Sequence, residues 1–420
     1  MEEIIKIEGK HRLNGKVKIS GAKNATVALI PALVLADEPV TLQGIPDITD
    51  VDALAEILTY LGIKVNITGD ELTVDPSEME NKEIPHELTS KLRASYYFMG
   101  SLLGKYKEIQ MKLPGGCYLG PRPINLHVKG FESLGAQEVE SYSGYHLRAD
   151  KLVGTKIYLD FASVGATINI LLAATKAEGT TIIENAAKEP EIIDVCNLLN
   201  KMGAKIKGAG TDVITIIGVD YLHGCIHEII PDRIVAGTYL IIAAAAGDYV
   251  EIENIIPQHL ESLTSKMEEM GVDLEILEDS IIVRKSTDLK GVDISTQVYP
   301  GFATDLQQPF TTLLTQAKGI SKITDNIYPE RFKHTYELNN MGANLTTANN
   351  LAIVEAPTPL RGTQVKATDL RCGAALVVAG LIAEGVTEID NIYHIDRGYA
   401  KIDEVLVGLG AKMWREPKER

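Results

Sequence analysis

The chain has 420 residues, of which 45% are hydrophobic and 23% charged, a composition typical of soluble globular proteins and not of disordered or fibrous ones. This length predicts two domains. The net charge of -16 argues against nucleic acid or an anionic membrane as a partner, because both require a dominant basic surface. No apolar stretch reaches the roughly 20 residues of a membrane span, and no secretory pattern opens the chain, so we expect a cytoplasmic protein.

A repeated phrase runs along the chain: a helix ends in Leu or Met, and Gly and then Ile, Ala or Val follow. The glycines recur about every 70 residues, at Gly62, Gly135, Gly203, Gly271, Gly342 and Gly410. Glycine just past an amphipathic helix ends that helix, because it takes the left-handed conformation at little cost. The pattern therefore predicts six copies of one structural unit.

A nearly all-apolar segment stands before a short β-branched strand in each unit, and the amphipathic helix follows that strand. An apolar segment of this length predicts a buried helix. In chain order the six segments are residues 25–35, 94–103, 166–174, 235–246, 308–316 and 373–383. Each unit is thus interpreted as a strand, a buried helix, a strand, a surface helix and further strands.

Six units are too many for one core and divide naturally into three plus three. The sequence predicts an α/β fold with two pseudo-threefold domains built from β-α-β-α-β-β repeats. We place the first domain at residues 22–231 and the second at residues 1–21 plus 232–420. A solenoid is the alternative for tandem units, but its end repeats would be polar caps, whereas here they are as apolar as the middle ones.

Polar residues interrupt the repeats at two equivalent positions. The first, the start of each buried helix, holds Lys23-Asn24, Arg93, Ser163-Val164-Gly165, Asp232-Arg233, Asp305 and Arg371. The second, the loop after the middle strand, holds Cys117, Arg122, Arg331 and Arg397. Helix N-termini favour anions, and the arginine fork matches carboxylate and phosphate. One arginine alone would be an ordinary solvated residue, but their recurrence predicts an anion-binding cleft between the two domains.

The four cysteines include no Cys-x-x-Cys pair, which argues against a zinc site or a disulfide framework. Cys196, Cys225 and Cys372 lie in core-like or strand-like segments and are interpreted as packing residues. Cys117 differs, because it lies in a glycine-rich loop that is longer than its counterparts in the other repeats. Lys112 and Arg122 would favour its thiolate. We therefore predict a reactive Cys117 on a movable lid.

Motifs spread over essentially the whole chain resemble those of the UDP-N-acetylglucosamine 1-carboxyvinyltransferases. They are Gly21-Ala22-Lys23-Asn24-Ala25, Pro114-Gly115-Gly116-Cys117, Arg122-Pro123, Ser163-Val164-Gly165-Ala166-Thr167, Thr304-Asp305, Glu330-Arg331-Phe332, Asp369-Leu370-Arg371 and Asp396-Arg397-Gly398. The resemblance implies two inside-out α/β domains. It also implies transfer of the enolpyruvyl group of phosphoenolpyruvate to the 3′-hydroxyl of UDP-N-acetylglucosamine, with release of phosphate, in peptidoglycan synthesis. We expect no metal and no cofactor.

The same resemblance assigns roles to single residues. Asp305 matches the base, and Cys117 matches the acid that also forms an adduct with phosphoenolpyruvate and is alkylated by fosfomycin. Phosphoenolpyruvate would be held by Lys23, Asn24, Arg122, Arg331, Arg371 and Arg397. UDP-N-acetylglucosamine would contact Arg93, Arg122, Pro123, Ile124, Asn125, Leu126, Ser163, Val164, Gly165, Asp305 and Ile327. For His127, a contact with uridine and packing within its loop both remain open.

Two positions depart from the family pattern, since Asn125 stands where many members have aspartate and Phe161 where many have lysine. Both departures concern the nucleotide and not the chemistry. Two other functions remain open. A related transferase acts on shikimate 3-phosphate, but the Pro-Gly-Gly-Cys segment argues against it. A silent paralogue would only bind the sugar nucleotide, but the presence of Cys117 and Asp305 argues against it.

Overall fold

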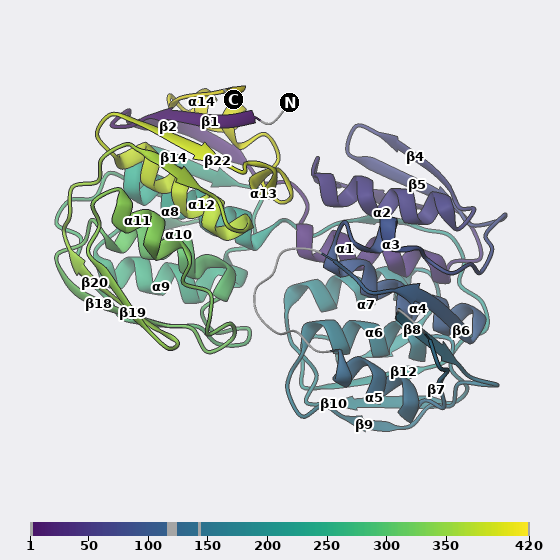
Figure 1. The fold of residues 1–420 in the computed structure, drawn as a ribbon. Helices are drawn as coiled ribbons and strands as arrows, with labels where there is room; N and C mark the ends of the chain where they lie inside the picture. Colours follow the sequence, from purple (N-terminus) through teal and green to yellow (C-terminus); the bar gives the residue numbers. More distant parts are fainter. Residues whose placement is uncertain (1–2, 116–123, 142–143, 419–420) are drawn as a thin grey trace. The chain divides into compact units, whose positions relative to one another are not determined.

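The computed structural model describes residues 3–115, 124–141 and 144–418 (Figure 1). The predicted site residues Cys117, Arg122 and Pro123 lie outside these residues. The described chain forms two compact units, which we call the first unit, from Gly21 to Ile230, and the second unit, which combines the residues up to Ser20 with those from Pro231 onward. In the described residues, no helix is both long enough and apolar enough to cross a membrane.

The first unit packs buried helices against an outer layer of helices and small sheets. Its buried helices are α1 (Lys23–Ala32) with its continuation η1 (Leu33–Leu35), α4 (Tyr97–Tyr106) with its leading turn η2 (Arg93–Tyr96), and α6 (Val164–Ala174). Its other helices are α2 (Thr49–Tyr60), the short α3 (His86–Thr89), α5 (Asn125–Ser133) and α7 (Pro190–Lys201). The three predicted buried helices of this half of the chain are therefore confirmed.

The sheets of the first unit have three or four strands among the described residues. In spatial order they are β13 (Ile226–Glu228), β3 (Val40–Gln43), β5 (Glu71–Asp75) and β4 (Lys64–Thr68); β6 (Glu108–Lys112), β8 (Gly144–Arg148) and β7 (Gln137–Glu138); and β11 (Lys205–Lys207), β12 (Val213–Ile217), β10 (Thr180–Glu184) and β9 (Lys156–Tyr158). The pairs β13–β3 and β9–β10 are parallel. A parallel pair requires a crossover connection, and α6 supplies the one between β9 and β10.

The second unit repeats this plan. Its buried helices are α8 (Arg233–Ala246), α10 (Thr304–Leu314) and α12 (Leu370–Ile382), which confirms the other three predicted helices. The remaining helices are η3 (Pro257–Leu260), α9 (Glu261–Met270), α11 (His334–Asn340), α13 (Tyr393–Asp396) and α14 (Ile402–Gly408).

The sheets of the second unit take in the start of the chain. In spatial order they are β15 (Asp273–Ile276), β16 (Ser280–Arg284), β14 (Gly247–Glu253) and β2 (Leu13–Lys18); β17 (Ile294–Ser295), β18 (Gly319–Thr324), β20 (Leu351–Ala356) and β19 (Leu345–Ala348); and β21 (Gln364–Lys366), β22 (Val386–Asp390), β1 (Glu3–Glu8) and β23 (Lys412–Pro417). β2 runs parallel to β14, while β1 is antiparallel to both β22 and β23.

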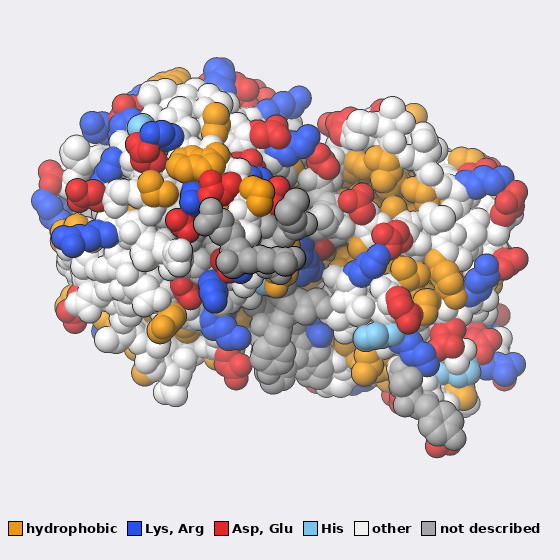
Figure 2. Space-filling model, turned by 45° about the horizontal axis from the view of Figure 1, so that its top comes forward, with side chains coloured by type: hydrophobic (Ala, Val, Ile, Leu, Met, Phe, Trp, Pro, Cys, Tyr) orange, Lys and Arg blue, Asp and Glu red, His pale blue; other side chains and the backbone are white. Residues whose placement is uncertain are grey.

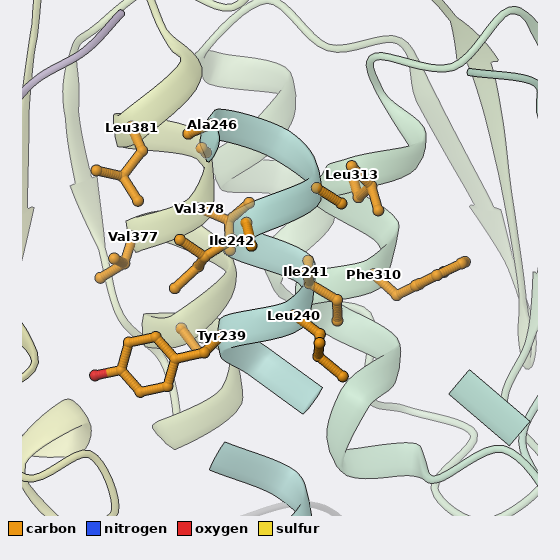
Figure 3. Close-up of a cluster of buried hydrophobic side chains, with 14 of the residues drawn as sticks. Tyr239, Leu240, Ile241, Ile242, Ala246, Phe310, Leu313, Val377, Val378 and Leu381 are labelled. Atoms are coloured by element: carbon orange, nitrogen blue, oxygen red, sulfur yellow. The ribbon is translucent and has the colours of Figure 1, made fainter. Parts of the chain in front are cut away.

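The core of the second unit is the packing of α8, α10 and α12 on one another (Figure 3). Ile242 from α8, Phe310 from α10 and Val378 from α12 are at most 1% exposed. Fully burying side chains of this size contributes about 1.5–3 kcal/mol each. α8 and α12 carry apolar residues on nearly all sides because every side is covered, which is the property that the sequence pattern detected. α10 also buries polar side chains, among them Gln307, Gln308, Thr311 and Thr312.

The repeated glycines end helices as predicted. All six have φ between +85° and +107°, in the region that residues with a side chain rarely adopt. The buried helices begin with side-chain caps at three places. Ser163 caps α6, Asp232 caps α8 and Asp369 caps α12, each accepting a hydrogen bond from a backbone N–H of the first turn. Local sequence thus fixes both ends of the repeat.

Candidate active site

A carboxylate held by two buried arginines forms the centre of the candidate site in the second unit. Asp305, in the first turn of α10, accepts a hydrogen bond from Arg331 Nη1 at 2.7 Å through Oδ1. Its Oδ2 accepts one from Arg371 Nη2 at 3.1 Å. Both arginine side chains are 3% exposed, whereas that of Asp305 is 24% exposed. The structure therefore brings together three of the predicted residues, two from the fifth repeat and one from the sixth.

The charges of this cluster compensate each other. Burial disfavours the charge on Arg331, but the carboxylates of Asp305 and Asp369 outweigh burial and raise the pKa of Arg331. The pKa of Arg371 is likewise raised, because Tyr399 and Asp305 outweigh burial. Both guanidiniums are therefore permanent cations that lie next to the partly exposed carboxylate of Asp305. Such a site can exchange that carboxylate for the carboxylate or phosphate of a ligand.

A second layer of polar contacts holds the cluster. Arg371 Nη1 donates to the Tyr399 hydroxyl at 3.0 Å, and this hydroxyl lies 2.9 Å from Thr238 Oγ1 on α8. Arg331 Nη1 also donates to Thr304 Oγ1 at 3.1 Å, and that hydroxyl donates to Asp325 at 2.8 Å. The guanidiniums thus have little freedom to turn.

Asp325 connects this layer to a predicted sugar contact. It is fully buried and follows β18, and its Oδ1 accepts hydrogen bonds from the backbone N–H groups of Ile327 and Tyr328 at 3.0 and 2.8 Å. Ile327 is half-buried. Since Asp325 also holds Thr304, the segment of Ile327 is tied to the start of α10.

His334 is the first residue of α11 and lies three residues after Arg331 in the sequence. Its side chain is fully buried. Neither ring nitrogen has a hydrogen-bond partner among the described residues. Its ring stacks on Phe332 with the centroids 6.2 Å apart. Burial lowers the pKa of His334 to about 3, against the opposing charge of Asp369, so the imidazole is neutral.

In the first unit, Lys23 and Asn24 stand in the first turn of α1, where they were predicted. The Lys23 ammonium forms an ion pair with Asp50 on α2, and the two side chains are 12% and 6% exposed. A desolvated lysine keeps its charge when a carboxylate accompanies it. Asn24 is half-buried beside it.

Arg93 and the start of α6 lie in a second polar cluster of the first unit. The Arg93 guanidinium lies 6.0 Å from the centre of the Tyr96 ring, and this ring contacts His127 edge-on at 5.0 Å. Asn169 Nδ2 lies 2.8 Å from His127 Nδ1. A Cβ added at Gly165 would lie 2.8 Å from the Tyr96 hydroxyl and 3.0 Å from His127 Cε1. Gly165 therefore lets the start of α6 approach both rings.

His127 itself is 5% exposed and lies within α5, where it packs against Tyr96, and a contact with uridine stays untested. Burial and the charge of Arg93 lower the pKa of His127 to about 3. Of the three preceding residues, Ile124 and Leu126 are half-buried and Asn125 is exposed. Phe161 is also exposed, at 51%, two residues before the Ser163 cap. Both departures from the family pattern thus lie at the surface of the first unit.

The helix starts differ from the prediction in one respect. We expected free N–H groups there to bind an anion, but Ser163, Asp232 and Asp369 already cap α6, α8 and α12. Asp369 Oδ1, for example, accepts from the N–H groups of Arg371 and Cys372 at 2.9 and 3.1 Å. Anion binding at the start of α12 therefore depends on the Arg371 side chain more than on the backbone.

The remaining predicted residues are placed as follows. Arg397 is half-buried and directly follows α13. Lys112, proposed as a neighbour of Cys117, pairs with Glu83 at 2.8 Å. Burial raises the pKa of Cys196 and of Cys372 to about 12, which agrees with their predicted packing role. No group of three His, Cys, Asp or Glu side chains in the described parts of the chain could hold a metal ion.

Several residues of the site were not predicted. Tyr399 is a partner of Arg371, Asp50 is a partner of Lys23, and Asp325 accepts a hydrogen bond from Thr304. Asp325 had a detectable signal, because an acidic residue followed by Asn also stands at the end of a strand at Glu184-Asn185, Glu253-Asn254 and Asp390-Asn391. Asn169 had a detectable signal, since it is a lone amide within an apolar helix. On the face in view in Figure 2, acidic and basic side chains are interspersed over both units and no single-sign field is visible.

Comparison with known proteins adds the following findings. Residues 7–406 match the family described as EPSP synthase (3-phosphoshikimate 1-carboxyvinyltransferase). UDP-N-acetylglucosamine 1-carboxyvinyltransferase 2 of Bacillus cereus is 58% identical over 417 residues, which are 99% of this chain and 97% of the relative. Its counterpart in Bacillus subtilis is 57% identical over 415 residues, again 99% of this chain and 97% of the relative.

Solved structures agree with the predicted fold class. The enolpyruvyl transferase NikO from Streptomyces tendae has a TM-score of 0.91 at 26% identity, with 100% of both chains covered. An EPSP synthase from Acinetobacter baumannii has a TM-score of 0.77 at 19% identity, with 99% of this chain and 100% of that chain covered, and this similarity concerns the fold alone. The predicted α/β class is thus confirmed.

Proposed function

Because this chain belongs to the UDP-N-acetylglucosamine 1-carboxyvinyltransferases of the EPSP synthase family, we propose that it transfers the enolpyruvyl group of phosphoenolpyruvate to the 3′-hydroxyl of UDP-N-acetylglucosamine. Phosphate is the second product, and the reaction is the first committed step of peptidoglycan synthesis. The observation that carries the proposal is the partly exposed Asp305 carboxylate between the buried Arg331 and Arg371. The enzyme works in the cytoplasm in this proposal.

The arginines and Asp305 would act in sequence. Phosphoenolpyruvate brings a carboxylate and a phosphate, both of which match the arginine fork. When these anions bind Arg331 and Arg371, the Asp305 oxygens lose their guanidinium partners. A carboxylate that loses stabilising cations becomes a stronger base. Substrate binding therefore activates Asp305 to accept the proton of the 3′-hydroxyl.

The bonds then change in two steps. The sugar oxygen bonds to C2 of phosphoenolpyruvate while a proton is added to C3, which gives a tetrahedral adduct. Return of a proton from C3 to the Cys117 thiolate and loss of phosphate from C2 then restore the double bond. Asp305 takes the hydroxyl proton, and Cys117 supplies the proton to C3. Lys23, Asn24, Arg122 and Arg397 hold the phosphoenolpyruvate.

The sugar nucleotide uses the remaining predicted set. Ser163, Val164, Gly165 and Arg93 lie at or near the start of α6, and Ile124 to Leu126 lie at the start of α5. Arg122, Pro123, Asp305 and Ile327 complete the assignment. Because Asn125 and Phe161 are exposed, their departures from the family pattern would alter nucleotide affinity and leave the chemistry intact.

The test of the overall reaction is phosphate release from phosphoenolpyruvate with each of two acceptors. We expect release with UDP-N-acetylglucosamine and none with shikimate 3-phosphate. Release only with shikimate 3-phosphate would reassign the substrate. Binding of UDP-N-acetylglucosamine without any turnover would identify a silent paralogue.

The test of Cys117 is mass spectrometry after fosfomycin treatment, with and without UDP-N-acetylglucosamine. We expect one adduct, on Cys117, and faster labelling with the sugar nucleotide. Cys117→Ser should lose the label and most turnover, whereas Cys117→Asp, which can still donate a proton, should retain turnover and escape the label. Cys225→Ser is the matched control, because Cys225 is the least buried of the described cysteines. A label on Cys225 would mean that Cys117 was the wrong thiol.

A further inference from the structure

The loop from Arg397 to Lys401 joins α13 to α14 and carries two groups of the candidate site. We assign Arg397 to phosphoenolpyruvate, and the Tyr399 hydroxyl accepts a hydrogen bond from Arg371. Lys401, at the end of the loop, has φ +45° and ψ +44°. The backbone of a residue with a side chain rarely adopts this left-handed conformation, which persists only where surrounding contacts impose it. The loop therefore needs an external support.

Arg415 provides contacts at both ends of this loop. Its Nη1 and Nη2 donate to the two carboxylate oxygens of Asp396 at 3.0 and 2.7 Å, which is the bidentate fork geometry. Asp396 is the last residue of α13 and directly precedes Arg397. Nη2 also donates to Asp403 Oδ1 at 3.0 Å, and Asp403 lies in the first turn of α14. One guanidinium thus links the residues before and after the loop.

Arg415 itself belongs to a strand of a sheet. Arg415 lies in β23, where it pairs with Ile5 of β1 in the antiparallel register. The side chains of Arg415, Asp396 and Asp403 are 24%, 30% and 17% exposed, so solvent screens their attraction only in part. The hydrogen bonds to Asp396 and Asp403 raise the pKa of Arg415, which keeps the guanidinium charged. The loop is therefore tied to a hydrogen-bonded sheet.

We propose that Arg415 is a positioning residue for phosphoenolpyruvate: by holding Asp396 and Asp403, it fixes the loop that presents Arg397 to the substrate and Tyr399 to Arg371. This inference rests on the proposed function, in which Arg397 binds phosphoenolpyruvate. A displacement of about 1 Å in a positioning group can cost as much as 100-fold in rate. Arg415 thus acts on the substrate without touching it.

The experiment measures KM for each substrate in Arg415→Gln and Arg415→Lys. Gln removes the charge and the fork, so we expect KM for phosphoenolpyruvate to rise at least tenfold and KM for UDP-N-acetylglucosamine to stay within twofold. Lys keeps the charge but cannot span two carboxylates with a planar fork, so its KM for phosphoenolpyruvate should lie between those of Gln and the wild type. A split between the two KM values separates positioning from general loss of structure.

The matched control is Arg284→Gln. Arg284 is also a strand arginine with two carboxylate partners, Glu275 and Asp273, but it contacts neither α13 nor α14 among its described partners. Its KM values should equal those of the wild type. Trp414, the sole tryptophan of the chain and the neighbour of Arg415 in β23, reports by its fluorescence whether the strand keeps its environment. If Arg415→Gln does not fold, Asp403→Asn opens one end of the link and should raise KM for phosphoenolpyruvate about threefold.

Two results would overturn the proposal. One is a KM for phosphoenolpyruvate within twofold of the wild type in both Arg415→Gln and Asp403→Asn. The other is an equal rise of both KM values, which would show a general disturbance of the second unit and no specific effect on phosphoenolpyruvate. Calorimetric titration of phosphoenolpyruvate keeps this test separate from the proposed function. A wild type that binds phosphoenolpyruvate but does not use UDP-N-acetylglucosamine would refute only the proposed acceptor, and the affinities of the variants would still decide the role of Arg415.

Discussion

Asp305→Asn tests the charge compensation at the centre of the candidate site. Asparagine keeps the shape of the side chain but cannot neutralise Arg331 and Arg371, which are each 3% exposed at the side chain. Removing one partner of a buried ion pair costs about 3–5 kcal/mol. The cost here should be smaller, because Asp305 is 24% exposed and Thr304 and Tyr399 remain as partners. We expect a loss of about 2 kcal/mol in the unfolding free energy.

The assay is urea unfolding at pH 7.5, followed by the fluorescence of Trp414. This residue lies in the second unit, as Asp305 does, so its signal reports the unit that carries the change. Asp288→Asn is the control, because Asp288 pairs with Lys318 on the surface of the same unit, and its midpoint should match the wild type. Turnover of Asp305→Asn should fall by at least 100-fold, since the base is lost.

Unfolding in the presence of added phosphate is a second test of the charge compensation. The freed guanidiniums of Asp305→Asn should bind an added anion better than those of the wild type, where the carboxylate competes. A ligand that binds the folded state stabilises it in proportion to the logarithm of its concentration. Added phosphate should therefore raise the unfolding midpoint of the variant more than that of the wild type. Equal midpoints without phosphate, or an equal response to phosphate, would refute the compensation argument.

Two further predictions concern the buried imidazole of His334 and the close approach of Gly165 to Tyr96. The pKa of His334 is about 3 in the folded chain and ordinarily 6.5, so below pH 6.5 the unfolded chain binds a proton that the folded one does not. The folded state therefore loses stability as the pH falls, by about 2 kcal/mol at pH 5. In urea unfolding followed by Trp414 fluorescence, His334→Gln should lose less stability than the wild type between pH 7.5 and pH 5. Equal losses in the two proteins would contradict this prediction. Gly165→Ala places a Cβ 2.8 Å from the Tyr96 hydroxyl, and it should raise KM for UDP-N-acetylglucosamine about tenfold. Gly408→Ala is the control, because no atom lies within 4 Å of its added Cβ, and it should leave this KM unchanged.

The sequence by itself determined the repeating elements. The six glycines take positive φ and the six apolar segments are buried helices, because both properties depend on residues within one turn of each other. The recurrence of cations at equivalent repeat positions also indicated Arg331 and Arg371 as members of an anion-binding site. The long glycine-rich loop indicated Cys117 as a reactive residue, and motif resemblance added its role as the acid. Cys117 lies outside the described residues, so this role stays a prediction.

Only the tertiary structure decided which side chains meet. Asp305 contacts Arg331, 26 residues away, and Arg371, 66 residues away, and the Arg371 contact with Tyr399 joins two further segments. Arg415 likewise holds Asp396 and Asp403 from the last strand, and β1 pairs with β22 and β23 near the other end of the chain. Such contacts depend on how the helices and sheets of a unit pack together. Local periodicity carries no information about that packing, and for this reason the sequence named Arg331, Arg371 and Asp305 but not the contacts between them.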